Sequence, residues 1–269
     1  LETQVYHSPP FSGWPCAEEA GLPCPAGFRE TWVVLRAIIF DFDGIIVDSE
    51  PLIFRLTQQM AAREGWSVTE EEYYRDYLAL DDRGVIEHLY STHGRPVDEV
   101  RRDELIAWKF QAYQEIIRDG LPAMPGAVEF VKKAAARFPL AIASGSLRVE
   151  IEHLLNKLGL RDQFAVLATA DDCRRSKPDP EVYLKALARL GPLPPFRQDP
   201  PRSAECLAIE DAPLGVDAAH AAGMKCLALT HSHPAENLRH ADWLHREFAE
   251  VDLDRIAAAF EKRPASGSA

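Results

Sequence analysis

The sequence predicts an α/β protein built on a doubly wound parallel sheet, with an all-helical domain inserted after the first strand. Two observations lead to this fold class. After residue 125, short apolar segments alternate with helical segments, which is the pattern of parallel strands joined by right-handed crossovers. Between the first apolar segment, 33–41, and this alternating region lies a long stretch, 51–124, with helical periodicity and no strand pattern.

The composition is that of a globular protein with a proper core. Hydrophobic residues make up 46% of the 269 residues and charged residues 27%. No apolar stretch approaches the ~18 residues that a membrane helix needs. The first residues have neither the basic nor the apolar region of a secretory signal. We therefore expect a cytoplasmic protein with no membrane partner.

The charge balance is acidic, with 42 Asp and Glu against 30 Lys and Arg and a net charge of −12. Non-specific nucleic-acid binding needs Lys and Arg to neutralise phosphates, so the composition argues against a nucleic-acid partner. An anionic substrate would have to be captured by local groups rather than by the overall field.

The first strand is predicted at VVLRAIIFD (33–41), a short β-branched run of the kind that is buried on both faces of a parallel sheet. The preceding residues, 1–32, are rich in proline and lack a sustained period. We expect them to form a poorly ordered N-terminal extension outside the fold.

The helical domain is predicted at 51–124. A helix over 50–64 ends at Gly65, which can take the left-handed conformation of a helix C-terminus. Thr69, with Glu72 three residues later, forms a capping-box pattern that opens the next helix. Further helical patterns cover 82–92 and 98–119.

The α/β core is predicted to combine 33–50 with 125–269. Its later strands are expected at 139–144, 163–169, 205–210 and 225–230, and its helices at 126–137, 148–159, 180–190 and 213–222. The segment 191–202 is a proline-rich surface loop. The cysteines lack metal-ligand spacing, which favours reduced thiols used as small apolar residues: Cys16, Cys24, Cys173, Cys206 and Cys226.

The first chemical signal is Asp41-Phe42-Asp43-Gly44, at the end of the first strand. Ligands of open parallel sheets bind at the carboxyl ends of the strands, so two acids there are well placed. Strand alternation directs Asp41 and Asp43 to the same side, with Phe42 packed behind them. Gly44 permits a tight turn and a close backbone approach to an anion. On its own, this pattern is also typical of a simple turn.

Two further signals suggest a site for phosphate oxygens. Ser144-Gly145-Ser146 follows the second core strand and offers a hydroxyl and flexible backbone amides. Lys177, in SKPDP ahead of a helix, offers a positive charge. Taken singly, each is also typical of an ordinary turn or of a solvated surface residue.

The last signal is Glu210-Asp211, two carboxylates that end a buried strand. Burying charge is costly unless it is compensated, and a hard oxygen-seeking cation such as Mg²⁺ would compensate it. These groups follow successive strand ends, so we expect them to gather at one edge of the sheet.

In this order, DFDGIIVDSEP, IASGS, SKPDP and AIEDAPLGVDAA resemble the four motifs of the haloacid dehalogenase-like hydrolases. They are most similar to the branch that contains β-phosphoglucomutase and phosphoglycolate phosphatases. The resemblance covers about residues 35–262, including a helical cap after the first strand. It implies a Rossmann-like core and a phosphatase that hydrolyses a small phosphorylated metabolite, of sugar phosphate or phosphoglycolate type.

The resemblance also implies roles. Asp41 would attack phosphorus and form an aspartyl-phosphate, while Asp43 would protonate the leaving oxygen and then activate water. Mg²⁺ would be held by Asp41, the backbone carbonyl of Asp43 and Asp211, with Glu210 as a further ligand or a supporting group.

Ser144, Gly145 and Lys177 would stabilise charge on the transferring phosphoryl group. The cap would close over the site and select the leaving group by contacting it. Within the cap, Arg83 is the residue we expect to contact substrate. An exposed charge on a helix surface is the plainer interpretation of Arg83.

Two alternative functions share these motifs. In the β-phosphoglucomutase pattern, a His follows five residues after the Asp that matches Asp48; here that position is Ile53, which cannot relay a proton. The second alternative is a non-catalytic module that binds a phosphorylated ligand on the same fold. Haloacid dehalogenation itself is disfavoured, because dehalogenases lack the second acid of the first motif, here Asp43.

Overall fold

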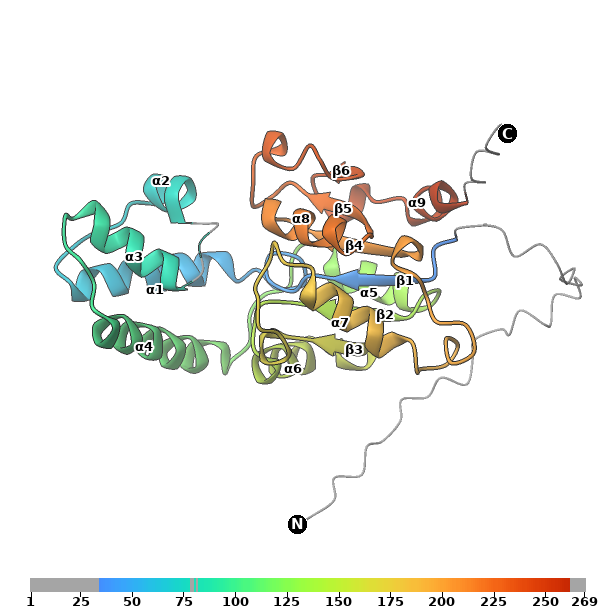
Figure 1. Cartoon of the computed structure of the whole chain (residues 1–269), viewed down its shortest axis with the longest axis horizontal. Coiled ribbons are helices and arrows are strands. Elements are labelled where there is room, and N and C mark those ends of the chain that lie inside the picture. Colours follow the sequence, from blue (N-terminus) through green and yellow to red (C-terminus); the bar gives the residue numbers. More distant parts are fainter. Residues whose placement is uncertain (1–33, 78–79, 81, 262–269) are drawn as a thin grey trace, which may run out of the picture.

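A computed structural model describes residues 34–77, 80 and 82–261; the predicted N-terminal extension lies outside them. Its centre is a six-stranded parallel sheet with the strand order β3-β2-β1-β4-β5-β6 (Figure 1). The strands are β1 (Ala37–Phe40), β2 (Leu140–Ala143), β3 (Phe164–Ala168), β4 (Cys206–Glu210), β5 (Lys225–Leu229) and β6 (Trp243–His245). The strand order reverses direction at β1 and β4, where an open sheet forms its ligand crevice.

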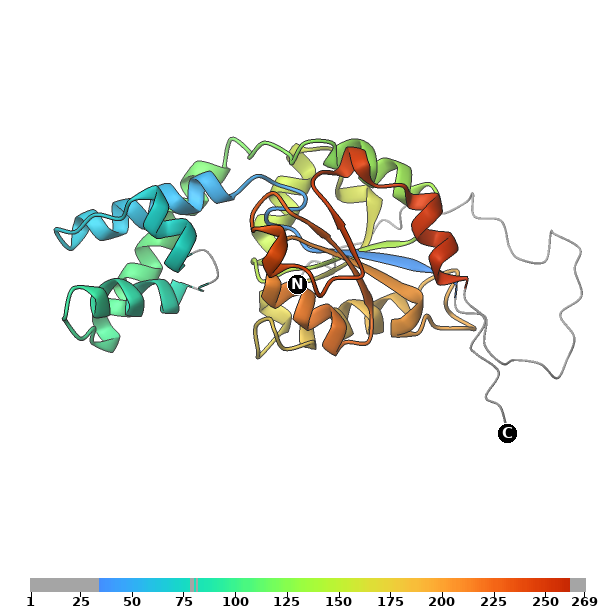
Figure 2. The ribbon, with the colours of Figure 1, turned by 90° about the horizontal axis from the view of Figure 1, so that it is seen from above.

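Helices cover both faces of the sheet, as Figure 2 shows from above. In β1, Ile38 and Phe40 join the cluster on one face, whereas Ala37 and Ile39 join the cluster on the other. The first face is covered by α5 (Ala127–Ala135), α6 (Arg148–Lys157) and α9 (Leu253–Phe260), and the second by α7 (Glu181–Leu190) and α8 (Pro213–Ala221). The prediction of a doubly wound sheet is confirmed.

The segment between β1 and α5 is helical and lies apart from the sheet in Figure 1. It contains α1 (Glu50–Arg63), the short α2 (Glu70–Glu72), a π-helix (Tyr73–Tyr77), α3 (Asp82–Thr92) and α4 (Glu99–Ile117). These helices pack around a hydrophobic cluster of their own, which includes Met60, Ile86 and Leu105. Among the described helices, none has the length and apolar character that crossing a bilayer requires.

The local signals in this helical unit are confirmed. Gly65 follows α1 with a φ of +79°, the left-handed conformation expected at a helix end. The Thr69 N–H donates to the Glu72 side chain at 2.8 Å, and the Glu72 N–H donates back to the Thr69 hydroxyl at 3.2 Å. The two bonds close the predicted capping box.

Three parts of the core differ from the sequence prediction. The first strand is shorter than 33–41, because only Ala37–Phe40 pairs with neighbours. Strand β6 and helix α9 were not predicted; β6 has only three residues and no buried apolar run. The proline-rich segment is not wholly a surface loop, since Phe196 is buried against the α7–α8 face. The described thiols Cys173, Cys206 and Cys226 are free, as expected.

Candidate active site

A cavity of about 830 Å³ lies between the carboxyl edge of the sheet and the helical unit. Asp41 follows β1 directly, and Asp211 follows Glu210, the last residue of β4. Because β1 and β4 are adjacent and parallel, their ends bring these acids together, as the sequence predicts. Asp41, Asp43, Gly44 and Asp211 all line the cavity.

Lys177 is the cation of this cluster. Its ammonium lies 2.6 Å from Oδ1 of Asp41 and 2.7 Å from Oε1 of Glu210, although it is 136 and 33 residues away in sequence. Glu210 is fully buried and also accepts a hydrogen bond from the Tyr183 hydroxyl at 2.6 Å. Glu210 therefore anchors Lys177 beside Asp41.

The cluster is strained electrostatically. Burial raises the pKa of Asp41 to about 7, against the opposing attraction of Lys177. Burial, together with repulsion from Asp41 and Glu210, raises the pKa of Asp211 well above its ordinary value. For Lys177, burial favours the neutral amine, but the Asp41 and Glu210 carboxylates outweigh it and raise the pKa. When ionised, the three buried carboxylates therefore carry more negative charge than Lys177 alone balances.

The donor set fits a divalent cation. Asp41, Glu210 and Asp211 each offer a carboxylate oxygen, and these three oxygens lie within 4.8 Å of one another. Carboxylate oxygens are the ligands that hard cations such as Mg²⁺ prefer. A bound cation would supply the missing positive charge and lower the raised pKa values of Asp41 and Asp211.

The turn after β1 is closed by the carbonyl of Phe42, which accepts hydrogen bonds from Ile45 and Ile46 at 3.3 and 2.8 Å. Gly44 has a φ of +71°, and a Cβ built on it would lie 2.1 Å from Oδ2 of Asp211. The Asp211 carboxylate therefore occupies the space that the missing side chain leaves. A ring nitrogen of His231 donates to the Gly44 carbonyl and holds the turn in place.

Asp43 lies on the same side of the turn as Asp41, and Phe42 is buried in the core behind them. The predicted alternation is therefore present. The Asp43 carboxylate accepts a hydrogen bond from the hydroxyl of Ser146, which follows β2. This bond orients the Asp43 side chain at the cavity wall.

The loop after β2 presents Gly145 and Ser146 to the cavity. Ser144 itself is buried: its hydroxyl accepts from the Ser146 N–H at 3.0 Å, and its own N–H donates to the Ala168 carbonyl at 3.0 Å. Neither Ser144 nor Lys177 lines the cavity, in contrast to the other predicted phosphate-binding residues, Gly44 and Gly145.

The helical unit forms the opposite wall. Arg83, from α3, lines the cavity, as does Lys109 from α4. Lys109 is buried and paired with Asp82, whereas Arg83 is exposed and has no ion pair within the described residues. The structure therefore brings Arg83 to the same cavity as the motif residues.

Sequence reasoning missed several cavity residues, notably Lys109, Tyr113 and His233. It included Ser146 in the Ser144–Ser146 turn but did not foresee its hydrogen bond to Asp43. A usable signal existed for α4, where Ile106, Lys109 and Tyr113 recur at helical spacing and share one face. For His233, in the loop after β5, no comparable signal exists, because its position depends on how that loop folds back over the site.

Several known proteins resemble this chain over most of its length. A relative from Streptomyces hygroscopicus subsp. limoneus, validoxylamine A 7'-phosphate phosphatase, is 32% identical over 233 residues, covering 82% of this chain and 98% of the relative. Hexitol phosphatase B of Escherichia coli is 31% identical, covering 72% of this chain and 83% of the relative.

Two solved structures share the fold. CbbY from Rhodobacter sphaeroides, in complex with xylulose-(1,5)bisphosphate, has a TM-score of 0.67 and 25% identity, covering 80% of this chain and 96% of that chain. The β-phosphoglucomutase of Clostridium difficile has a TM-score of 0.70 and 21% identity, covering 84% and 97%. The sequence profile of the haloacid dehalogenase-like hydrolases matches residues 38–229. This chain belongs to the haloacid dehalogenase-like hydrolase family.

Proposed function

We propose that the protein is a Mg²⁺-dependent phosphatase that hydrolyses a small phosphorylated metabolite through an aspartyl-phosphate on Asp41. The observation that carries the proposal is the buried cluster in which Lys177, Glu210 and Asp211 surround Asp41 at a cavity wall. The relatives support it, since two of them are named as phosphatases, one of validoxylamine A 7'-phosphate and one of a hexitol.

In the first step, a carboxylate oxygen of Asp41 forms a bond to phosphorus while the bond to the leaving oxygen breaks. Asp43, oriented by Ser146, gives its proton to that oxygen, so the leaving group departs as an alcohol. In the second step, Asp43 takes a proton from water, the water oxygen attacks phosphorus, and the bond to Asp41 breaks. Inorganic phosphate is released.

Negative charge on the phosphoryl oxygens must be stabilised during transfer, so positive charge is needed there. Lys177 lies close enough to Asp41 to stabilise that negative charge. Mg²⁺, held by Asp41, Asp211 and the backbone carbonyl of Asp43, would add Lewis-acid stabilisation. Glu210 already binds Lys177 and Tyr183, which favours a supporting role for it over direct metal ligation. Gly145 would offer its backbone N–H to phosphate oxygens and Ser144 its hydroxyl, because the N–H groups of Gly44 and Ser144 are already donated to the Val47 and Ala168 carbonyls. Gly44 would contribute by letting the backbone approach the phosphate closely.

We further propose that the chain divides into an α/β core, 33–50 and 125–269, and a cap domain, 51–124. The separate hydrophobic cluster of the helical unit and its position opposite the motif residues support this division. Arg83 on the cap wall would contact the leaving group, and closure of the cap would exclude water until substrate is in place.

Hydrolysis is favoured over phosphoryl transfer to a second sugar hydroxyl. Ile53 lines the cavity at the position where a mutase would carry its proton-relaying His. With an apolar side chain there, Asp43 is free to activate water once the leaving alcohol departs.

The test is a panel of hexose, hexitol and pentose phosphates, assayed for inorganic phosphate with Mg²⁺ and with excess chelator. We expect one phosphate per substrate consumed, and no release after chelation. A parallel reaction with β-glucose 1-phosphate and glucose 1,6-bisphosphate is followed by NMR. Formation of glucose 6-phosphate faster than phosphate release would replace the phosphatase with a mutase, and ligand binding without any release would indicate a binding module.

A further inference from the structure

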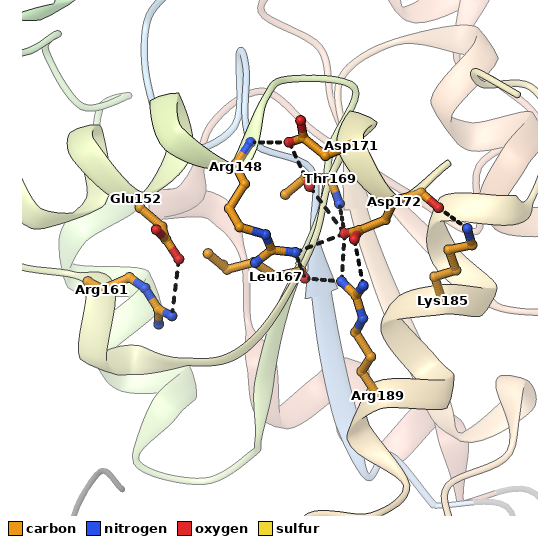
Figure 3. A network of polar contacts seen from close by, with 9 residues as sticks. All are labelled: Arg148, Glu152, Arg161, Leu167, Thr169, Asp171, Asp172, Lys185 and Arg189. Carbon is orange, nitrogen blue, oxygen red and sulfur yellow. Dashed lines mark hydrogen bonds and ion pairs between the residues drawn. The ribbon is translucent and has the colours of Figure 1, made fainter. Parts of the chain in front are cut away.

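A dense polar network lies beside the site, around the carboxylate of Asp172 in the turn after β3 (Figure 3). Arg189 donates to both of its oxygens at 2.6 Å, the bidentate geometry that makes such pairs strong. The same carboxylate accepts from Arg148 at 2.9 Å and from the Thr169 N–H at 3.0 Å. Asp172 thus joins α6, α7 and the end of β3.

The two arginines converge on one point. Arg148 and Arg189 both donate to the carbonyl of Leu167, at 3.0 and 2.6 Å. Two guanidinium groups that share an acceptor repel each other, and the Asp172 carboxylate between them offsets that repulsion. Arg189 chiefly holds the pKa of Asp172 well below its ordinary value, so the carboxylate is ionised at neutral pH.

The loop that presents Gly145 and Ser146 is fastened to the same turn. The Arg148 N–H, at the start of α6, donates to Asp171 at 2.7 Å. The Ala170 N–H donates to the Ser146 carbonyl at 3.1 Å. The position of the loop that contains Gly145 and Ser146 is therefore set by residues 170–172.

The loop that carries Lys177 begins at this turn and is held by charged residues on one face of α7. Glu181, Lys185 and Arg189 are four residues apart and share one helix face. Glu181 accepts the backbone N–H groups of residues 174 and 175 at 2.9 and 3.0 Å. Lys185 pairs with Glu181 at 2.9 Å and also donates to the Asp172 carbonyl.

We propose that Asp172 is a positioning residue that fixes the Ser144–Ser146 loop and the Lys177 loop relative to each other. The proposal rests on the phosphatase function proposed above. Asp172 acts without touching substrate, since neither it nor its partners line the cavity. Its loss leaves Arg148 and Arg189 facing each other, and it loosens the two loops that must surround one phosphoryl group.

The experiment compares Asp172→Ala and the milder Asp172→Asn with a control, Glu152→Gln, in the full-length protein with Mg²⁺. The control removes the Glu152–Arg161 ion pair at 3.8 Å, which is also drawn in Figure 3. Glu152 lies on α6, the helix that also carries Arg148. Three quantities are measured well below each variant's melting temperature. They are kcat and KM for 4-nitrophenyl phosphate, and the Kd for inorganic phosphate by calorimetry.

For Asp172→Ala we expect kcat to fall and the phosphate Kd to rise, each by roughly tenfold or more, because a misplacement of about 1 Å can cost on the order of 10²-fold. Asp172→Asn, which keeps an acceptor for Thr169, should lie between this variant and wild type. Glu152→Gln should stay within about twofold of wild type, as expected for a long, partly exposed pair that touches neither loop.

A lower melting temperature for Asp172→Ala with unchanged kcat and phosphate Kd would overturn the proposal and leave a purely structural network. If Asp172→Ala does not fold, Asp172→Asn decides the question by the same two quantities. Should the wild type bind phosphate but release none from any substrate, the proposed function fails, and the Kd values alone decide the positioning role. A wild type that does not bind phosphate would refute both.

Discussion

The turn that carries Asp43 depends on the absence of a side chain at Gly44. Its φ is +71°, and an added Cβ would lie 2.1 Å from Oδ2 and 2.9 Å from Cγ of Asp211. Real Cβ atoms do not approach so closely, and the nearest atoms belong to a short side chain fixed at the end of β4. We predict that Gly44→Ala displaces Asp211 from the position where it would hold the metal.

The structure provides a matched control for backbone strain. Gly65 has a similar φ of +79°, but a Cβ there would meet nothing within 4 Å. Both substitutions should cost ~1–2 kcal/mol of folding stability for the left-handed conformation. Only Gly44→Ala should also weaken Mg²⁺ binding, by at least the roughly 10–100-fold that loss of a group supporting a metal ligand costs.

The assay is a Mg²⁺ titration of phosphate release, paired with urea unfolding of both variants. Gly65→Ala should show reduced stability and the wild-type Mg²⁺ dependence. Gly44→Ala should require far more Mg²⁺ and should remain slower at saturation. Wild-type Mg²⁺ affinity and kcat for Gly44→Ala would refute the close packing of Gly44 and Asp211.

Two further predictions concern the charges of the site. Lys177→Met leaves Asp41 and Glu210 without their buried partner and should lower the free energy of unfolding by roughly 3–5 kcal/mol in a urea experiment. The control Arg175→Met, at an exposed position in the same loop, should lower it by less than about 1 kcal/mol. Equal losses would contradict the buried pairing. In metal-free protein the raised pKa of Asp41, about 7, means that the folded state holds a proton which the unfolded state has released. Stability should therefore fall as pH rises from about 4 to above 7. Asp41→Asn should flatten this slope, and Mg²⁺ should raise the melting temperature more at pH 8 than at pH 5.5. An identical slope in Asp41→Asn would show that other groups govern it.

Much of the fold could be predicted because each of the strands β1 to β5 is a buried apolar run bounded by a polar turn. The site could be predicted for the same reason. Asp41 and Asp211 are far apart in sequence, yet both follow strands, and parallel strands end at one edge of a sheet. Local turn chemistry, such as the capping box at Thr69, was equally readable.

The remaining features depend on contacts between distant segments. The hydrogen bond from Ser146 to Asp43 requires the exact spacing of two loops, which no local pattern encodes. Lys109 enters the cavity only because the helical unit lies opposite the sheet edge. No local sequence pattern marks Asp172, since its arginine partners lie 17 and 24 residues away.

The central claim is that Asp41 is the nucleophile. Its most direct test is rapid acid quenching of the enzyme during turnover, followed by proteolysis and mass spectrometry. We predict a phosphate on the peptide that contains Asp41, formed within the first turnover, and its absence in Asp41→Asn. Turnover with no covalent phosphate on any peptide, or with wild-type kcat in Asp41→Asn, would contradict the covalent mechanism.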